Sequence, residues 1–550
     1  MKDRKTIAWL LQLNRKQWWR ICLLAASMIL AALLSVAVAL LTRYVVDSAA
    51  NGLDATFLRF AALLAAAGAG QILLFFLNRH LSVDIASGIA ISMQTLVFRK
   101  LLRKDYAAIG NYHSGVLLRR LTSDVDTVAN GMTEILPGAL SMSVRLIAAF
   151  AVVCMMELRL ALAFLAIGIA AMLAAALLRK KMKQLHRAEQ ETAERTTGFM
   201  QESLGNLLVI KTFGAEETMD ARTDLLQGER RNAIRRRKRY GALMSLFMNT
   251  AFYGGYILGL IWGAVGIANH AMTFGMFASV IQLLGQIERP LTTISGYAPQ
   301  LAAVLSSAER IRELLELPEE TPAHTDDLES GLEAVGISGV TFSYDREQVL
   351  RRADFCLQKG EFAVLTGQSG IGKSTLMKLL LGVYKPTEGE TYLQKDGQKL
   401  PLDSTTRSLF AYVPQGNFLL SGTIRENVCM VCPNAADEDV ERALAISDAA
   451  EFVSQLPDGI HTVIGERGVG LSEGQAQRIA IARALMTDAP ILLLDECTSA
   501  LDEQTERRLL ENLRSMTDKT CLLISHKKAA TEICDSVYRV VDGKIERTGS

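Results

Sequence analysis

Residues Gly367 to Thr375 read Gly-Gln-Ser-Gly-Ile-Gly-Lys-Ser-Thr and fit the phosphate-loop pattern G-x-x-x-x-G-K-[ST] at every fixed position. The apolar run from Phe362 to Leu365 predicts a buried strand before the loop, and the run from Thr375 to Leu381 predicts a helix after it. Glycines let backbone N–H groups converge on phosphate oxygens, and a lysine adds positive charge. This context argues against a chance match. The predicted phosphate-binding residues are Gly367, Gln368, Ser369, Gly370, Ile371, Gly372, Lys373, Ser374 and Thr375, with Ser374 also a Mg²⁺ ligand.

A second chemical signal is the apolar run from Ile491 to Leu494, which ends in the carboxylates Asp495 and Glu496. A buried strand would deliver both side chains at its carboxyl end. Beside a phosphate loop, Asp495 is placed to bind Mg²⁺, and Glu496 is placed to orient and polarise an attacking water. The alternative is a core strand followed by solvated acids. It loses force because the phosphate loop lies upstream in the same domain.

The overall composition limits what kind of protein carries these motifs. A chain of 550 residues is too long for one hydrophobic core and predicts two to four domains at roughly 150 residues each. The mean hydropathy is +0.20 and half of the residues are hydrophobic, which predicts a membrane protein with a soluble part. The net charge of +1 indicates no nucleic-acid partner. The eight cysteines lack a disulfide-framework spacing and are expected to be reduced thiols.

Apolar runs of about twenty residues, the length that spans a bilayer, recur along the first part of the chain. Two of the connecting loops are long and rich in Lys and Arg, whereas the others are short and poor in them. The positive-inside rule then places both termini on the cytoplasmic side of the cell membrane. The six predicted spans are residues 21–41, 57–77, 135–156, 160–178, 242–267 and 274–298.

Both long loops remain helix-compatible but become charged, so helices are expected to continue well beyond the membrane. For the segment that ends near Tyr106, about fifty residues at 1.5 Å per residue give a rod of roughly 75 Å. Breaks at residues 110–115 and 213–217 contain glycines and predict turns or short transverse helices at the far end of each rod.

A change in composition near Arg310 marks the end of the membrane part. A polar, proline-bearing linker is expected over residues 318–332. Apolar strands, glycine turns and amphipathic helices then alternate over residues 333–550, as is typical of an α/β nucleotide-binding domain. The predicted fold is an α-helical membrane domain, residues 1–317, with six transmembrane helices and long cytoplasmic extensions, followed by an α/β P-loop ATPase domain.

The sequence resembles an ATP-binding-cassette (ABC) half-transporter of the exporter type, in which a transmembrane domain precedes the nucleotide-binding domain. The segment Leu471-Ser472-Glu473-Gly474-Gln475 is similar to the family signature Leu-Ser-Gly-Gly-Gln and departs from it only at Glu473. The resemblance is strong after residue 333 and weak in the membrane part. Further family positions are matched by Tyr344, Gln415, Asp502 and His526.

The resemblance assigns roles to residues that the local pattern alone would not. It implies that Tyr344 stacks on the adenine of ATP, and that Gln415 links Mg²⁺ and the attacking water to the transmembrane domains. It also implies that His526 hydrogen-bonds the γ-phosphate, which makes it a catalytic residue beside Glu496. Taken singly, His526 and Tyr344 would be an ordinary loop histidine and an ordinary strand aromatic. The family order of the motifs is what assigns them.

The resemblance also implies a dimer. Ser472, Gly474 and Gln475 would contact ATP bound by the opposite subunit, and the segment from Ser499 to Asp502 would form the family's D-loop. The partner could be a second copy of this chain or a related half-transporter. Glu473 favours a heterodimer, because a carboxylate near the triphosphate would weaken one of the two ATP sites. The breaks at 110–115 and 213–217 correspond in position to the family's two coupling helices.

The function that this resemblance implies is ATP-driven export of a substrate across the cytoplasmic membrane by alternating access, with ATP and Mg²⁺ as cofactors. Membrane lipid, a dimer partner and the transported substrate are the expected partners, and nucleic acid is not. One alternative is an ATP-gated channel or regulatory subunit, although such proteins tend to lose the catalytic glutamate or histidine. A second alternative is uptake by an exporter-like fold.

Charged residues within two predicted spans suggest where the substrate binds. Arg145 lies near the middle of the third span, and Glu288 and Arg289 lie within the sixth. A charge at that depth is costly and is expected to face a cavity or a partner rather than lipid. One interpretation is a structural ion pair between Arg145 and Glu288. The other is a polar patch that contacts a charged or amphipathic substrate.

Overall fold

The computed structural model describes residues 2–110, 112–321, 330–344, 347–416, 419–465 and 468–549. The chain divides into two compact units. The helical unit comprises Met1–Arg99 and Ser114–Glu316, and the P-loop unit comprises Lys100–His113 and Leu317–Ser550. The P-loop unit therefore contains part of the first long loop as well as the C-terminal domain. Residues 322–329 of the predicted linker lie outside the described residues.

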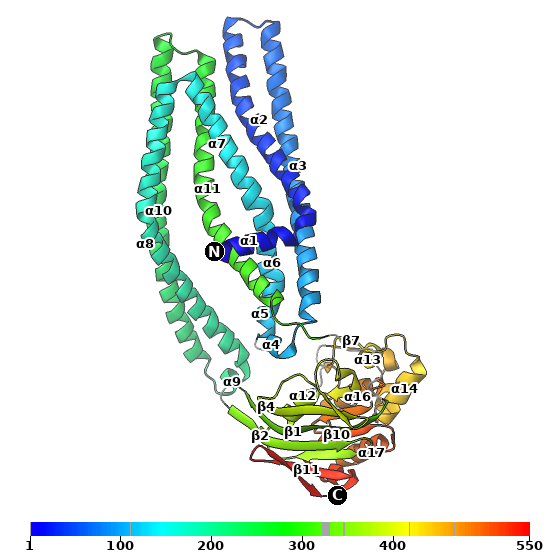
Figure 1. Ribbon diagram of the computed structural model, residues 1–550. Coiled ribbons are helices and arrows are strands. Elements are labelled where there is room, and N and C mark those ends of the chain that lie inside the picture. Colours follow the sequence, from blue (N-terminus) through cyan, green and yellow to red (C-terminus); the bar gives the residue numbers. More distant parts are fainter. Residues whose placement is uncertain are drawn as a thin grey trace. The chain divides into compact units, whose positions relative to one another are not determined.

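Long helices make up the helical unit (Figure 1). Gly52, with φ of 128°, makes the turn after α2, and Glu157 has an extended backbone between α7 and α8. The long helices are α1 Lys2–Leu13, α2 Trp18–Asn51, α3 Ala55–Leu101, α7 Leu136–Met156, α8 Leu158–Gly205, α10 Glu216–Ala268 and α11 Phe274–Leu315. Shorter helices are the 3₁₀ turn Arg15–Gln17, α5 Ser114–Arg119 and α6 Val125–Asn130, with π-helical turns at Arg120–Asp124 and Gly131–Ile135.

Two groups of helices pack within this unit. α8 lies beside α10, and α2, α7 and α11 contact one another (Figure 1). The contact between α7 and α11 buries Ala149, Val153 and Leu283 completely. Ser35 of α2 donates to Gln286 Oε1 of α11 at 3.0 Å, and Gln286 Nε2 donates back to the Ser35 carbonyl at 2.7 Å. Such reciprocal polar contacts fasten apolar helices together.

Four described helices are long and apolar enough to cross a bilayer: Trp18–Ala50, Ala55–Leu101, Ser114–Met156 and Glu216–Ala268. Two shorter apolar stretches, Leu158–Ala170 and Phe274–Glu288, begin α8 and α11. The apolar helices indicate a multi-pass membrane protein. Each of the six predicted spans falls within one of these helices, but the limits of the spans and the domains stay predictions.

The chain leaves its helices at both predicted breaks, and the short helices lie a few residues ahead of them. The structure has them at α4 Tyr106–Gly110 and α9 Leu207–Thr212, ahead of most of residues 110–115 and 213–217. After α9, Gly214 has φ of 61° and lies beyond the end of the helix rather than within it. The glycine-rich breaks therefore mark where these helices end.

The P-loop unit contains one mixed six-stranded sheet and one antiparallel four-stranded sheet. The six-stranded order is β12 Lys544–Gly549, β11 Ser536–Val541, β3 Phe362–Thr366, β10 Thr520–Ile524, β9 Ile491–Asp495 and β6 Phe410–Val413, with only β12 antiparallel to its neighbour. The four-stranded order is β2 Glu347–Gln358, β1 Leu332–Tyr344, β4 Glu388–Lys395 and β5 Gln398–Pro401. A small pair joins β7 Gly422–Thr423 to β8 Val463–Ile464.

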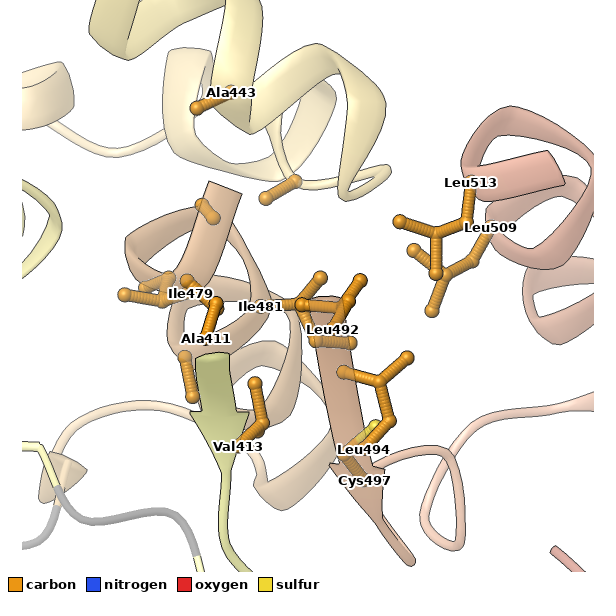
Figure 2. Close-up of a cluster of buried hydrophobic side chains, with 14 of the residues drawn as sticks. Ala411, Val413, Ala443, Ile479, Ile481, Leu492, Leu494, Cys497, Leu509 and Leu513 are labelled. Atoms are coloured by element: carbon orange, nitrogen blue, oxygen red, sulfur yellow. The ribbon is translucent and has the colours of Figure 1, made fainter. Parts of the chain in front are cut away.

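Alternation along the central strands creates two cores. Leu492 and Leu494 of β9 face one side, and Ile491 and Leu493 face the other. Figure 2 shows the first core, where β6 and β9 meet the surrounding helices. Helices of this unit are α12 Lys373–Leu380, α13 Ile424–Val428, α14 Asp437–Ile446, α15 Ala450–Ser454, α16 Glu473–Leu485, α17 Glu503–Arg514 and α18 Lys528–Ile533, with 3₁₀ turns at Arg407–Leu409 and Gly459–His461.

Candidate nucleotide site

The order of the central strands brings the predicted phosphate loop and carboxylates together. Strand β10 pairs in parallel with both β3 and β9, so Ile524 lies opposite Leu365 on one side and Asp495 on the other. The residues that follow these strand ends therefore meet at one edge of the sheet. Ligands of open α/β sheets bind at this edge, outside the carboxyl ends of the strands.

The phosphate loop has the backbone that its glycines predict. Gly372 has φ of 113°, and a Cβ atom there would lie 2.6 Å from Val349 Cγ1, so only glycine fits. Lys373 is the first residue of α12 and is only 5% exposed. Its ammonium donates to the carbonyls of Gly367 at 2.7 Å and Gln368 at 3.0 Å. Burial lowers the pKa of Lys373, and the charges of Glu496 and Asp495 oppose that shift.

His526 follows β10 and meets the same lysine. Its Nε2 atom lies 2.9 Å from Lys373 Nζ, which places the imidazole at the mouth of the phosphate loop. The predicted position of His526 beside a bound γ-phosphate is consistent with this contact, because a lysine of this loop reaches the same phosphates.

Asp495 is the buried carboxylate of the site. It is 2% exposed and accepts hydrogen bonds from Ser374 Oγ at 3.1 Å and from the Tyr412 hydroxyl at 3.2 Å. Burial raises the pKa of Asp495, and these two hydrogen bonds act in the opposite direction. Burial also raises the pKa of Tyr412, so this phenol stays protonated and donates.

The arrangement around Asp495 fits a magnesium ion. Mg²⁺ is commonly bound through one or two protein oxygens together with the phosphates of a nucleotide. Ser374 and Asp495 supply two such oxygens beside the phosphate loop. No group of three or more His, Cys, Asp or Glu suited to a metal occurs among the described residues, so a metal here would rely on the nucleotide for further ligands.

Glu496 is set apart from Asp495 by its backbone. Its φ of 49° lies in the left-handed region, which a residue with a side chain rarely adopts. Gln415, just after β6, donates from Nε2 to Glu496 Oε2 at 2.6 Å. The two residues that the sequence assigns to the attacking water therefore contact each other directly. Strained backbone of this kind is concentrated at functional sites.

Tyr344 ends β1 and forms an aromatic group beside α12. Its side chain is 38% exposed, and its hydroxyl lies 3.4 Å from Thr375 Oγ1. Phe342 and Tyr384 each meet the Tyr344 ring edge-on, with centroid distances of 5.0 and 5.5 Å. These edge contacts fix the ring while leaving part of it open, which suits stacking on a base.

The signature residues belong to a second group, around the start of α16. Ser472 caps this helix: its hydroxyl accepts from the Gln475 N–H at 3.3 Å, and Gln475 Oε1 accepts from the Ser472 N–H at 2.9 Å. A Cβ atom on Gly474 would lie 3.0 Å from Leu501 Cδ2. Glu473 is exposed at the first position of the helix.

Asp502 caps the helix that follows it. Its carboxylate accepts from the Thr505 N–H at 2.9 Å and caps α17, and this hydrogen bond lowers the pKa of Asp502. Contact between Asp502 and nucleotide stays a prediction. The D-loop is also joined to α16, because Gln477 Nε2 donates to Ser499 Oγ at 3.0 Å.

Sequence reasoning missed two residues that hold this machinery. Tyr412 carries no chemical motif of its own, although a tyrosine on a strand beside β9 is placed to reach Asp495. Lys527, the residue after His526, donates to the carbonyls of Thr498 at 2.7 Å and Leu501 at 2.6 Å. These hydrogen bonds link the segment that carries His526 to the D-loop. No local pattern signals Lys527, because its partners come from another segment.

The candidate substrate residues lie in the helical unit. Arg145 is half-buried on α7, and Glu288 is exposed on α11, where it lines a cavity of about 260 Å³ among α8, α10 and α11. Phe164, Phe252 and Tyr256 contribute aromatic rings to the same cavity. The side chain of Arg289 lies outside the described part of the chain.

Comparison with known proteins agrees with these observations. Residues 21–291 match the family described as "ABC transporter transmembrane region", and residues 350–499 match the family described as "ABC transporter". An "ATP-dependent lipid A-core flippase" from Chromohalobacter salexigens is 31% identical over 89% of this chain and 84% of its own length. A "Mitochondrial potassium channel ATP-binding subunit" from Mus musculus is 30% identical over 87% of this chain and 68% of its own.

A solved structure supports the fold. The "Structure of a bacterial Atm1-family ABC exporter with ATP bound" superposes with a TM-score of 0.82, covering 97% of this chain and 96% of its own, at 23% identity. The expected fold class, a helical transmembrane region fused to an ABC-type P-loop ATPase domain, is confirmed, as is the prediction of an ATPase-coupled transporter. The chain belongs to the ABC transporter family, with its transmembrane region and its ATPase domain in one polypeptide.

Proposed function

We propose that this chain exports an amphiphilic substrate across the cytoplasmic membrane by alternating access, driven by ATP hydrolysis. The observation that carries the proposal is the convergence of Lys373, Asp495 and the Glu496–Gln415 pair at one sheet edge. Lys373 and Ser374 bind the triphosphate, and Tyr344 stacks on the base. Both residues that channel-type relatives tend to lose, Glu496 and His526, are present.

The residues of the site divide the work of hydrolysis. Lys373 exchanges its carbonyl acceptors for phosphate oxygens when ATP enters, because its ammonium already lies at the mouth of the loop. Glu496 orients the attacking water, and Gln415 holds the carboxylate in place at 2.6 Å. His526 donates to the γ-phosphate. A magnesium ion at Ser374 and Asp495 would neutralise charge on the transferred phosphoryl group.

ATP is hydrolysed at composite sites in a dimer. Ser472, Gly474 and Gln475 form a capped helix start, in which Ser472 is exposed and Gln475 is half-buried. The N-terminus of α16 and the Ser472 hydroxyl suit the γ-phosphate of a nucleotide bound by another subunit. Glu473 adds a carboxylate to this surface, which repels a phosphate and favours pairing with a related chain that supplies a stronger signature. Both termini lie in the cytoplasm, by the distribution of Lys and Arg.

The substrate contacts a polar patch within the helical unit that comprises Arg145, Glu288 and Arg289. Arg145 and Glu288 lie on neighbouring helices, and both are about 17–21 Å along the helix axis from the predicted outer ends of α7 and α11. The cavity that Glu288 lines is otherwise formed mainly by apolar and aromatic residues. This combination of an apolar wall and a charged side chain is typical of a site for an amphiphile.

The test is a charge exchange, Arg145→Glu combined with Glu288→Arg, in purified protein reconstituted in lipid vesicles. We measure ATP hydrolysis with and without two probes, a fluorescent cationic amphiphile and a short-chain fluorescent phospholipid. A substrate role predicts that the exchange restores folding lost in either single variant but not stimulation by the probe. Restored folding and restored stimulation together would reduce the pair to a structural ion pair.

A further inference from the structure

The short segment after α11 is joined by its backbone to the segment after α3. Lys104 and Glu319 form an isolated antiparallel bridge. The Asp105 N–H donates to the Pro318 carbonyl at 2.9 Å, and the Glu320 N–H donates to the Arg103 carbonyl at 2.9 Å. Paired backbones of this kind move as one body. Residues 103–105 of the first long loop and residues 318–320 of the linker therefore form a single piece within the P-loop unit.

Glu320 joins this piece to the rest of the P-loop unit. Its carboxylate accepts two hydrogen bonds from the Arg407 guanidinium, at 2.8 and 3.1 Å. One of its oxygens also lies 3.3 Å from the N–H of Tyr106, the first residue of α4. The Arg407 and Glu320 side chains are 32% and 22% exposed. Paired, bidentate geometry makes such a contact stronger and more directional than a surface ion pair.

Arg407 has a third contact, and it leads to the nucleotide site. Its Nε donates to the carbonyl of Leu381 at 3.2 Å. Leu381 is the residue that follows α12 directly, and α12 begins with Lys373 of the phosphate loop. A guanidinium at a helix C-terminus is favoured by the helix dipole. One side chain therefore holds both the end of the phosphate-loop helix and the carboxylate of the linker.

We propose that Glu320 and Arg407 form a coupling joint, which transmits nucleotide occupancy at the start of α12 to the first cytoplasmic loop and the linker. This inference rests on the proposed function. The helix of about 12 Å carries a displacement of the phosphate loop to Leu381 as a rigid rod. Arg407 transmits this displacement to Glu320. Glu320 transmits it to α4 and to the segment that follows α11. The two residues are positioning residues, since neither contacts the phosphate loop.

The sequence supplies a built-in reporter for this joint. All four tryptophans, Trp9, Trp18, Trp19 and Trp262, belong to the helical unit, and the P-loop unit has none. A change in tryptophan emission on nucleotide binding therefore reports on the helical unit alone. Nucleotide affinity, measured separately by calorimetry, reports on the P-loop unit.

The experiment titrates full-length protein in lipid vesicles with Mg²⁺ and a non-hydrolysable ATP analogue. The variants are Glu320→Ala, Glu320→Gln, Arg407→Ala and the double alanine variant. The matched control is Glu390→Ala with Lys399→Ala, which removes an ion pair of 3.2 Å between two exposed side chains on β4 and β5. Thermal unfolding shows which variants fold, and the conservative Glu320→Gln keeps an acceptor for Tyr106.

The joint predicts that analogue affinity stays within about threefold of wild type while the tryptophan response falls below about a third. The double variant should lose no more of the tryptophan response than either single variant loses, because the two residues act through each other. The control should keep the full response. An unchanged response, a loss in the control, or affinity and response falling together would overturn the joint. If the wild-type chain does not bind the analogue, the proposed function itself fails.

Discussion

At the scale of single residues, Glu496 and Asp495 differ in spite of being neighbours. Asp495 is buried and hydrogen-bonded to Ser374 and Tyr412, whereas Glu496 has left-handed backbone and contacts Gln415. A run of apolar residues followed by two acids predicted both positions. It could not predict the sharp change in backbone that aims the two carboxylates at different tasks, because φ at Glu496 depends on the packing of the following segment.

We expect Glu496→Gln to lower ATP hydrolysis to about a hundredth of wild type or less, since a positioned general base contributes about 10²–10⁴-fold. ATP affinity should stay within about threefold, because Lys373 and Asp495 are unchanged. Steady-state hydrolysis and calorimetric ATP binding measure the two effects. Hydrolysis retained at about a tenth of wild type would remove Glu496 from this role.

Tyr412→Phe should weaken the apparent affinity for Mg²⁺ by about threefold to tenfold, the net effect of losing one typical hydrogen bond. The Tyr412 hydroxyl donates to Asp495 at 3.2 Å and orients its carboxylate. Hydrolysis at saturating Mg²⁺ should recover. Tyr392→Phe, on β4, is the matched control and should leave the Mg²⁺ dependence as it is. Equal behaviour of the two variants would contradict a positioning role for Tyr412.

At the scale of elements, the strand before the phosphate loop, the helix after it and the strand before Asp495 were predicted correctly. Each is encoded by a local apolar pattern next to a glycine-rich or acidic motif. The glycines predicted the breaks that follow α4 and α9 but not the two short helices themselves, because glycine marks where a helix ends. Contacts such as Lys104 with Glu319, 215 residues apart, have no local signal at all.

Lys527→Met should destabilise the P-loop unit by roughly 2–4 kcal/mol, as expected when a buried carboxylate loses a partly exposed cation. Lys527 lies 3.5 Å from Glu506, whose side chain is 1% exposed, and donates to the carbonyls of Thr498 and Leu501. Thermal or denaturant unfolding measures the loss. Adding Glu506→Gln should recover part of it, because the uncompensated charge is removed. A double variant less stable than Lys527→Met would show that this explanation is wrong.

At the scale of the whole molecule, the proposed composite site requires two chains. Lys373→Ala removes the phosphate lysine and Ser472→Ala removes the signature hydroxyl, so neither variant alone should hydrolyse ATP well. A mixture places an intact phosphate loop opposite an intact signature in some dimers. For random pairing in a homodimer, about a quarter of the wild-type sites return. ATP hydrolysis after mixing measures this recovery. Full activity of Ser472→Ala alone would contradict the arrangement.

The most direct test of ATP-driven export uses inside-out membrane vesicles that contain either the wild-type chain or Glu496→Gln. The vesicles are incubated with a small-molecule extract of the producing cells, with and without ATP and Mg²⁺, and their contents are compared by mass spectrometry. The account predicts that at least one amphiphilic compound accumulates only with the wild-type chain and only with ATP. Identical contents in all four conditions, from a wild-type chain that hydrolyses ATP, would contradict it.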